Sequence, residues 1–238
     1  MESAGYTTLT RQDGLLREIQ TIANNIANAS TTGFRQEGVI FSEYVVQTVG
    51  GPSLSMATAN VRHTSLSQGP LTHTGGQLDF AIEGDGFFLI ETPAGQRLTR
   101  SGSFSVSGTG DLVTVDGHRV LDTGGTPVFV PPDADQIGLS EDGALSADGR
   151  LLGQLGIVQP LDRFDLLREG GVMFRTESAL EPVEGSRLLQ GHLEGANVDT
   201  MLQFARMLEV QRAYEMGQSF LDAENERVRD ALRTFTRR

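Results

Sequence analysis

The sequence predicts an α+β protein, with a helix at each end of the chain and a central β-rich domain built of hairpins. Near both termini, apolar residues recur at three- and four-residue steps, as they do on one face of a helix. Between the termini, short alternating or apolar runs are separated by Asp-Gly dipeptides, which are strong turn signals. The expected segments are an N-terminal helix in 1–33, a linker with short strands in 34–75, the β-rich domain in 76–194 and a C-terminal helix in 195–238.

The N-terminal segment carries its apolar residues at a near-heptad spacing. The steps between them are 4, 3 and 4 residues, which places them on one helical face and favours a coiled-coil-like partner. Gly33 is suited to end the helix in a left-handed conformation. The residues of this face are Leu15, Ile19, Ile22 and Ile26.

Three asparagines, Asn24, Asn25 and Asn28, interrupt this helix near its end. Asparagine is a poor choice for a solitary surface helix, because its amide competes with the backbone hydrogen bonds. In an array of helices, each amide can pair with amides or carbonyls of adjacent copies, and a buried asparagine fixes the register of a coiled coil. The alternative is an exposed helix with harmless polar residues.

Residues 69–191 hold 21 of the 29 glycines. Segments 110–122 and 142–154 resemble each other, since each has a strand, an Asp-Gly turn and a second strand. This pattern predicts antiparallel hairpins. The Asp-Gly turn signals are Asp85-Gly86, Asp116-Gly117, Asp142-Gly143 and Asp148-Gly149.

The C-terminal segment predicts one helix of roughly 35 residues, or about 50 Å. Asp199 or Asn197 is a plausible N-cap, and no proline follows. Such a length is typical of coiled coils and helical arrays. Phe204 and Met207 fall outside the main apolar stripe, so the helix is expected to contact more than one neighbour. That stripe includes Leu202, Ala205, Leu208, Met216 and Phe220.

Composition excludes several classes of function. The chain lacks cysteine, which removes disulfides, thiolate zinc sites and cysteine nucleophiles. No apolar run approaches the roughly 18–20 residues of a membrane span, and the N-terminus does not resemble an ordinary secretory signal. The net charge is −12, and residues 61–194 contain 9 arginines against 19 acidic residues, so no nucleic-acid partner is expected.

The sequence offers no convincing catalytic or metal-binding pattern. The four histidines, at positions 63, 73, 118 and 192, do not form a metal-binding spacing, and the paired acids lie in predicted turns. We therefore predict no enzyme activity, no cofactor and no metal. Two alternatives stay open: a β-rich hydrolase that uses the paired acids and is fused to oligomerising helices, or a binding module that its end helices trimerise.

Three motifs resemble the flagellar rod and hook family of axial proteins. The stretch IANNIANASTTGFR is similar to the family's N-terminal signature, and GANVDTMLQFARMLEVQRAYEMGQSFLDAENE is similar to its C-terminal partner. Between them, LDFAIEGDGFFLIETPAGQRLTRSGSFSVSGTGDLVTVDGHRVL resembles the family's β domain. The resemblance covers nearly the whole chain.

The resemblance implies a structural subunit of the bacterial flagellar basal-body rod. Family members are exported through the flagellar type III apparatus without a cleaved signal, and they polymerise with their own copies and other rod proteins. The product is a helical tube that crosses the periplasm, encloses the export channel and transmits motor torque to the hook. The terminal helices form its inner layer and fold on polymerisation. The chain's length and compact middle are most similar to proximal-rod members, with a distal-rod member as the alternative.

The same resemblance assigns roles to an assembly interface. Apolar residues are expected to supply buried packing, namely Ile19, Ile22, Ile26, Leu202, Ala205 and Leu208, and Leu15 is expected at the same interface. Polar residues are expected to set the register, namely Asn24, Asn25, Asn28 and Gln211. Gly33 and Phe34 are expected to turn the chain out of the inner layer, and the remaining contacts are expected from Tyr214, Met216 and Phe220.

Overall fold

The computed structural model describes residues 2–46, 54–183 and 185–236, and the chain divides into two compact units. The helical unit comprises residues 1–27, 36–65 and 198–238. The β unit comprises residues 28–35 and 66–197. Helices at both ends and a β-rich centre confirm the predicted α+β class.

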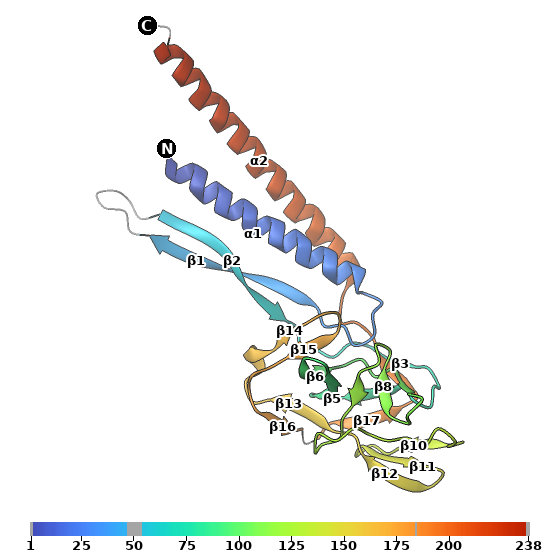
Figure 1. Ribbon diagram of the computed structural model, residues 1–238. Coiled ribbons are helices and arrows are strands. Elements are labelled where there is room, and N and C mark those ends of the chain that lie inside the picture. The colour runs from blue at the N-terminus through green and yellow to red at the C-terminus, as the bar shows by residue number, and fades with distance from the viewer. Residues whose placement is uncertain (1, 47–53, 184, 237–238) are drawn as a thin grey trace. The chain divides into compact units, whose positions relative to one another are not determined.

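The helical unit contains two helices and one long hairpin (Figure 1). Helix α1 (Glu2–Ala27) packs along α2 (Thr200–Thr236) and against the antiparallel hairpin of β1 (Glu37–Val46) and β2 (Leu54–Thr64). Segment 34–75, expected as a linker with short strands, thus contains strands of 10 and 11 residues. Its β-branched and aromatic content suits strands, but no Asp-Gly dipeptide separates the two runs, and the Gly50-Gly51 dipeptide between them was not used as a turn signal.

Helix α2 has the predicted length and the predicted cap. It runs for 37 residues, which corresponds to about 55 Å. The Asp199 carboxylate accepts the Leu202 N–H at 3.0 Å, so Asp199 is the N-cap. Helix α1 ends at Ala27, before the expected stop at Gly33, because the backbone turns at Asn28, whose carbonyl accepts the Thr31 N–H at 3.0 Å.

The β unit is built of short antiparallel strands. The first half of these strands is β3 (Leu71–His73), β4 (Phe80–Glu83), β5 (Phe87–Thr92), β6 (Gly95–Thr99), β7 (Phe104–Val106), β8 (Leu112–Thr114), β9 (Arg119–Val120) and β10 (Ile137–Leu139). The second half is β11 (Ala144–Ala147), β12 (Arg150–Gln154), β13 (Ile157–Pro160), β14 (Leu167–Arg168), β15 (Met173–Arg175), β16 (Leu180–Pro182), β17 (Arg187–Gln190) and β18 (His192–Glu194), with a 3-10 turn, η1 (Arg163–Asp165), before β14.

The strands form one large sheet and several smaller ones. In the largest sheet, as far as the structure describes the chain, the order is β14-β15-β6-β5-β9-β8-β7, and β13 pairs with both β5 and β16. Smaller sheets pair β10-β11-β12, β17-β4 and β18-β3.

Three of the four Asp-Gly signals lie at turns between paired strands, whereas Asp85-Gly86 connects β4 to β5, which pair with other strands. Asp148 and Gly149 join β11 to β12 with φ values of +48° and +78°, the paired left-handed conformation of a two-residue hairpin turn. Gly117, between β8 and β9, has a φ of +81°. Both hairpins inferred from the similar segments 110–122 and 142–154 are therefore confirmed.

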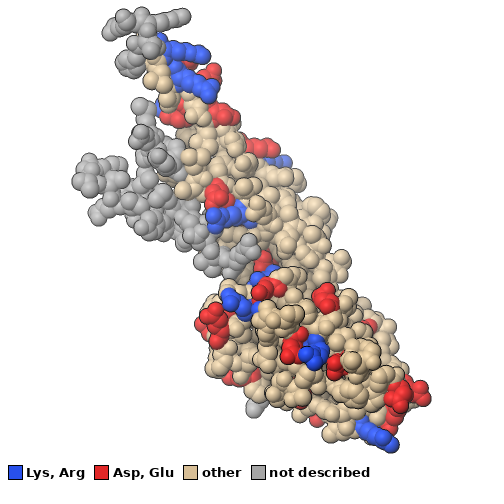
Figure 2. Space-filling view, viewed as in Figure 1, with Lys and Arg blue, Asp and Glu red and all other residues tan. Residues whose placement is uncertain are grey.

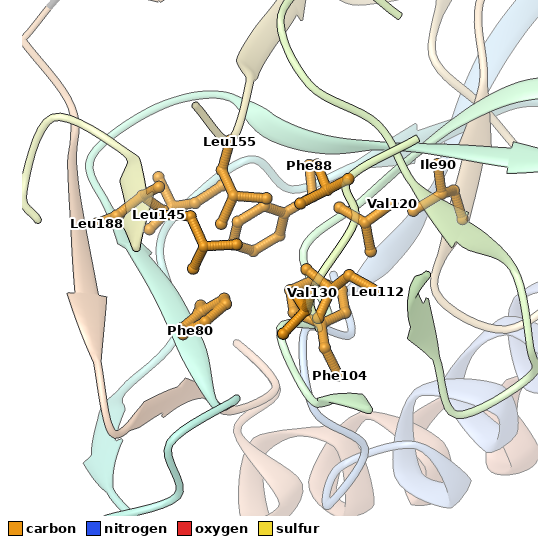
Figure 3. Packing of buried hydrophobic residues seen from close by; sticks show 12 residues of the cluster. Phe80, Phe88, Ile90, Phe104, Leu112, Val120, Val130, Leu145, Leu155 and Leu188 are labelled. Carbon is orange, nitrogen blue, oxygen red and sulfur yellow. The ribbon is translucent and has the colours of Figure 1, made fainter. Parts of the chain in front are cut away.

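The main core of the β unit lies among the phenylalanines of neighbouring strands (Figure 3). The rings of Phe88 and Phe104 meet edge to face at 5.2 Å between centroids, and Phe80 lies 5.9 Å from Phe104. Gly102 lets the backbone reach this cluster, because a Cβ there would lie 1.6 Å from the Phe80 carbonyl oxygen. Aliphatic side chains complete the cluster, including Ile90, Leu112, Val120, Val130, Leu145, Leu155 and Leu188.

Candidate assembly interface

The two helices pack through a small apolar seam. Leu15 and Ile22 of α1 and Val210 of α2 are buried, and further side chains are partly buried beside them. Sequence periodicity therefore identified the α1 side of the seam. The partly buried residues are Ile19, Ile26, Met207, Ala213 and Tyr214.

The side of α2 that faces α1 is not the side on which the first residues of the expected apolar stripe lie. At 3.6 residues per turn, Gln203, Val210 and Tyr214 share one side of the helix, whereas Ala205 and Leu208 lie on the other. Sequence reasoning missed Val210 because it counted apolar residues without knowing which side α1 covers. The off-stripe position of Met207 was the available signal, since that residue belongs to the seam.

Polar contacts set the register of α1 against α2. The Gln12 side-chain amide donates to the Tyr214 carbonyl at 2.9 Å, and Arg206 forms an ion pair with Glu18 at 2.8 Å. The hydrogen bond to Glu18 raises the pKa of Arg206. Gly217 makes room for the glutamine, because a Cβ there would lie 2.0 Å from the Gln12 amide nitrogen. Each contact joins one turn of α1 to one turn of α2.

Asn25 is fully engaged within its own chain. Its amide nitrogen donates to the Glu37 carbonyl at 2.7 Å and to the Gln203 side-chain oxygen at 3.2 Å, and its oxygen accepts the Glu37 N–H at 2.9 Å. The side chain is 1% exposed. Asn25 thus links α1 to both β1 and α2, whereas partners on adjacent copies were expected from the sequence.

The other two asparagines have different surroundings. Asn24 is exposed on α1, while Asn28 belongs to the turn that follows the helix in the β unit. The Asn28 side-chain oxygen accepts the Thr31 hydroxyl at 3.3 Å. Among the three asparagines, only Asn25 therefore reaches the interior of the helical unit.

The outward side of α2 presents apolar side chains to solvent. We call Met201, Leu202, Phe204, Ala205 and Leu208 the outer patch; all are exposed, Met201 to 81% and Leu202 to 62%. On the face drawn in Figure 2, charged side chains gather towards the C-terminal end of α2, and the stretch nearer its start is mostly uncharged. Contiguous exposed apolar surface is typical of protein–protein contacts. Other expected interface residues on this helix are also exposed, namely Gln211, Met216 and Phe220.

Gly33 and Phe34 anchor their segment inside the β unit. Gly33 has a φ of +70°, and a Cβ there would lie 2.3 Å from the Ser101 nitrogen. Its N–H donates to the Glu194 carbonyl at 2.7 Å. Phe34 is 1% exposed, and the Arg168 guanidinium lies 4.4 Å from its ring centre.

A buried ion cluster follows directly after Phe34. The Glu194 carboxylate lies 3.0 Å from the guanidinium of Arg35 and 3.0 Å from that of Arg100, and it accepts the Gly69 N–H at 2.9 Å. Arg35 and Glu194 are each 1% exposed, and Arg100 is 3% exposed. Burial lowers the pKa of Arg100 to about 10 and also lowers the pKa of Arg35, while Glu194 opposes both shifts. Sequence analysis missed this cluster, because its members are far apart in the chain.

One of the three acid pairs that suggested a hydrolase, Glu83 and Asp85, serves other contacts. Glu83 and Asp85 form exposed ion pairs with Arg187 at 3.1 Å and with Arg163 at 3.0 Å. Among the residues that the structure describes, no group of three or more His, Asp or Glu side chains is placed to hold a metal ion. Neither helix, over its described length, is apolar enough to cross a membrane.

Models of three protein families match the chain, and their order follows the three motifs. The model described as flagella basal body rod protein matches residues 6–35. The flagellar hook protein FlgE/F/G D1 domain matches residues 81–147, and the flagellar basal body rod FlgEFG protein C-terminal model matches residues 189–234.

Whole proteins of the same kind are similar along nearly the full chain. The flagellar basal-body rod protein FlgF of Caulobacter vibrioides is 37% identical over 98% of this chain and 97% of its own length. The FlgF protein of Mesorhizobium japonicum is 38% identical over 90% of both chains. The flagellar basal-body rod protein FlgG of Bacillus subtilis is 32% identical over 95% of this chain and 97% of its own length.

Proposed function

Because the chain belongs to the flagellar basal-body rod protein family and is a structural rod subunit, we propose that its terminal helices form the coiled-coil-like inner layer of a helical tube. The observation that carries this proposal is the outer patch on α2. One side of α2 is covered by α1, and the other presents large apolar side chains that a single chain leaves exposed. Neighbouring subunits in a tube provide the missing cover.

The free energy of burying the outer patch favours contact with neighbouring subunits. Fully burying a Leu, Met or Phe side chain contributes about 1.5–3 kcal/mol, so covering the outer patch supplies several kcal/mol for each subunit. The seam with α1 is small, and isolated helices are marginal in water without a buried face. We therefore expect the helices to be weakly ordered in a dilute single chain and to become stable on polymerisation.

The proposal also covers the position of the subunit in the rod and its path of export. The tube encloses the export channel and transmits torque to the hook, and the subunit reaches the periplasm through the flagellar export apparatus without a cleaved signal. We place the chain in the proximal rod, in line with its similarity to FlgF proteins. A distal-rod position is the second candidate, since a FlgG protein covers 95% of this chain.

A charge within the outer patch tests the interface. Leu208 is 56% exposed, so Leu208→Asp is expected to leave the fold of the single chain unchanged. In the tube it buries an unpaired carboxylate, which prevents incorporation into the rod. The matched control is Val115→Asp, which makes the same change at a residue 81% exposed in a turn of the β unit. Isolated basal bodies and swimming assays provide the readout.

The outcomes distinguish an effect of the substitution on assembly from an effect on the folding of the single chain. Failure of Leu208→Asp to assemble, with normal assembly of Val115→Asp and an unchanged circular dichroism spectrum for both, supports the proposal. Normal rods from Leu208→Asp contradict the role of this side of α2. Rapid amide exchange in α1 and α2 of the dilute single chain is also expected, and full protection of both helices there contradicts folding on assembly.

A further inference from the structure

Two of the four histidines of the chain lie side by side on a small sheet of the β unit. His73 of β3 stands directly opposite His192 of β18 in the antiparallel ladder, so both side chains leave the same face of the sheet. Their ring centres are 4.9 Å apart, and the ring planes meet at 76°. Sequence spacing did not reveal this pair, because the two residues are far apart in the chain.

The ring of His192 is held by a backbone carbonyl. Its Nδ1 lies 2.8 Å from the Gln190 carbonyl oxygen. Because a carbonyl oxygen only accepts, the neutral ring carries its proton on Nδ1 and keeps the lone pair of Nε2 for a ligand. Histidines that bind a metal ion almost always donate their other ring N–H to an acceptor of this kind.

The ring of His73 is exposed and lies beside the backbone next to His192. A Cβ at Gly191 would lie 3.8 Å from the His73 Nε2. The Gly191 carbonyl accepts the Thr74 N–H at 2.7 Å and the Gly75 N–H at 3.1 Å, so hydrogen bonds fix the two backbones where the rings meet. A ligand that joins the rings therefore orders little more than the His73 side chain.

The separation of the rings suits a metal ion bound by both. A Zn–N bond of about 2.1 Å places the ion about 3.2 Å from each ring centre. For ring centres 4.9 Å apart, the angle at the ion is then about 100°. This value lies between the angles of square-planar and tetrahedral coordination, about 90° and 109°. The exposed His73 ring turns from its edge-to-face contact to direct a nitrogen at the ion.

We propose that His73 and His192 bind a divalent transition-metal ion such as Zn²⁺ through one ring nitrogen each. Imidazole suits zinc, copper and nickel, whereas calcium and magnesium prefer oxygen ligands. Among the described residues no third His, Asp or Glu completes the site, so water fills the other coordination positions. The surrounding charge favours a cation, since residues 61–194 contain 9 arginines against 19 acidic residues. This inference concerns the β unit alone and does not depend on the rod function.

The test is a zinc titration of the untagged full chain, observed by NMR at the histidine ring resonances. Magnesium is present throughout, so that sites built from carboxylates alone are occupied. Expected is a saturable shift of the His73 and His192 signals at one equivalent of zinc. His73→Ala should raise the Kd by about tenfold or more, because one of two protein ligands is lost, and His192→Gln should do the same. The matched control is His118→Ala, which removes a histidine between β8 and β9 and should leave the Kd unchanged.

A second measurement is the Tm of the β unit. A ligand that binds the folded chain raises the Tm, so saturating zinc should stabilise the unsubstituted chain and His118→Ala but not His73→Ala. The side chain of His73 is exposed, so His73→Ala is expected to fold, and an unchanged amide spectrum without zinc checks this.

Three results overturn the proposal. The first is the absence of a saturable shift at these two rings. The second is a shift at only one of them, which indicates a single exposed imidazole and no shared ion. The third is a Kd, or a rise in Tm, that is the same in His73→Ala and His118→Ala, which locates the zinc elsewhere on the chain.

Discussion

Neutralising Glu194 is the most direct test of the buried ion cluster. In Glu194→Gln the side chain keeps its shape but loses the charge that two arginines share at 3.0 Å each. Arg35 and Arg100 then remain as buried cations without a carboxylate. Removing one partner of a buried ion pair costs about 3–5 kcal/mol, because the remaining charge is uncompensated.

The expected change is large enough for calorimetry of the full chain. For a unit of this size, 1 kcal/mol corresponds to about 3 °C, so the Tm of the β unit should fall by roughly 10–15 °C. Amide exchange should also accelerate at Gly69, whose N–H donates to the Glu194 carboxylate at 2.9 Å. The matched control, Glu83→Gln, breaks a pair with Arg187 that is 45% exposed on the glutamate side, and it should cost less than about 1 kcal/mol. Equal costs for the two variants would refute this account of the cluster.

Three further predictions follow from single positions. Gly102→Ala should lower the free energy of unfolding of the β unit by about 3 kcal/mol or more, because its Cβ would lie 1.6 Å from the Phe80 carbonyl oxygen. Gly108→Ala, with open space around it, should be nearly neutral. Similar values for both variants in urea unfolding would contradict the packing argument. Asn25→Leu should lower the free energy of unfolding of the helical unit by about 1–3 kcal/mol, since it removes the buried hydrogen bonds to the Glu37 backbone. An unchanged midpoint in urea unfolding would contradict this role. Hydrogen bonds from the Thr176 hydroxyl first, and then from backbone N–H groups, lower the pKa of Asp165 to about 2. The ionised carboxylate therefore stabilises the fold above pH 4, and this contribution is lost as the pH falls towards 2. An NMR titration of the Asp165 carboxyl with a midpoint near 3.8 would disprove this prediction.

Much of the fold could be predicted because its signals are local. The Asp148-Gly149 turn follows from two residues that accept left-handed conformations, and the Asp199 cap follows from one side chain at a helix start. The β1–β2 hairpin was underestimated, because no Asp-Gly dipeptide lies between its strands and the Gly50-Gly51 dipeptide there was not used as a turn signal. The three motifs that resemble the rod and hook family could also be recognised directly in the sequence, and the matching family models confirm that resemblance.

The sequence by itself determined which residues share a helical face, where the hairpins turn and which family the chain belongs to. Only the tertiary structure decided that α1 covers the Val210 side of α2 and leaves the Leu208 side exposed. It also decided that Asn25 binds the Glu37 backbone and that Glu194 joins two distant arginines. The physical reason is that periodicity and turn chemistry act between near neighbours, whereas burial and ion pairing depend on which distant segment occupies the adjacent space.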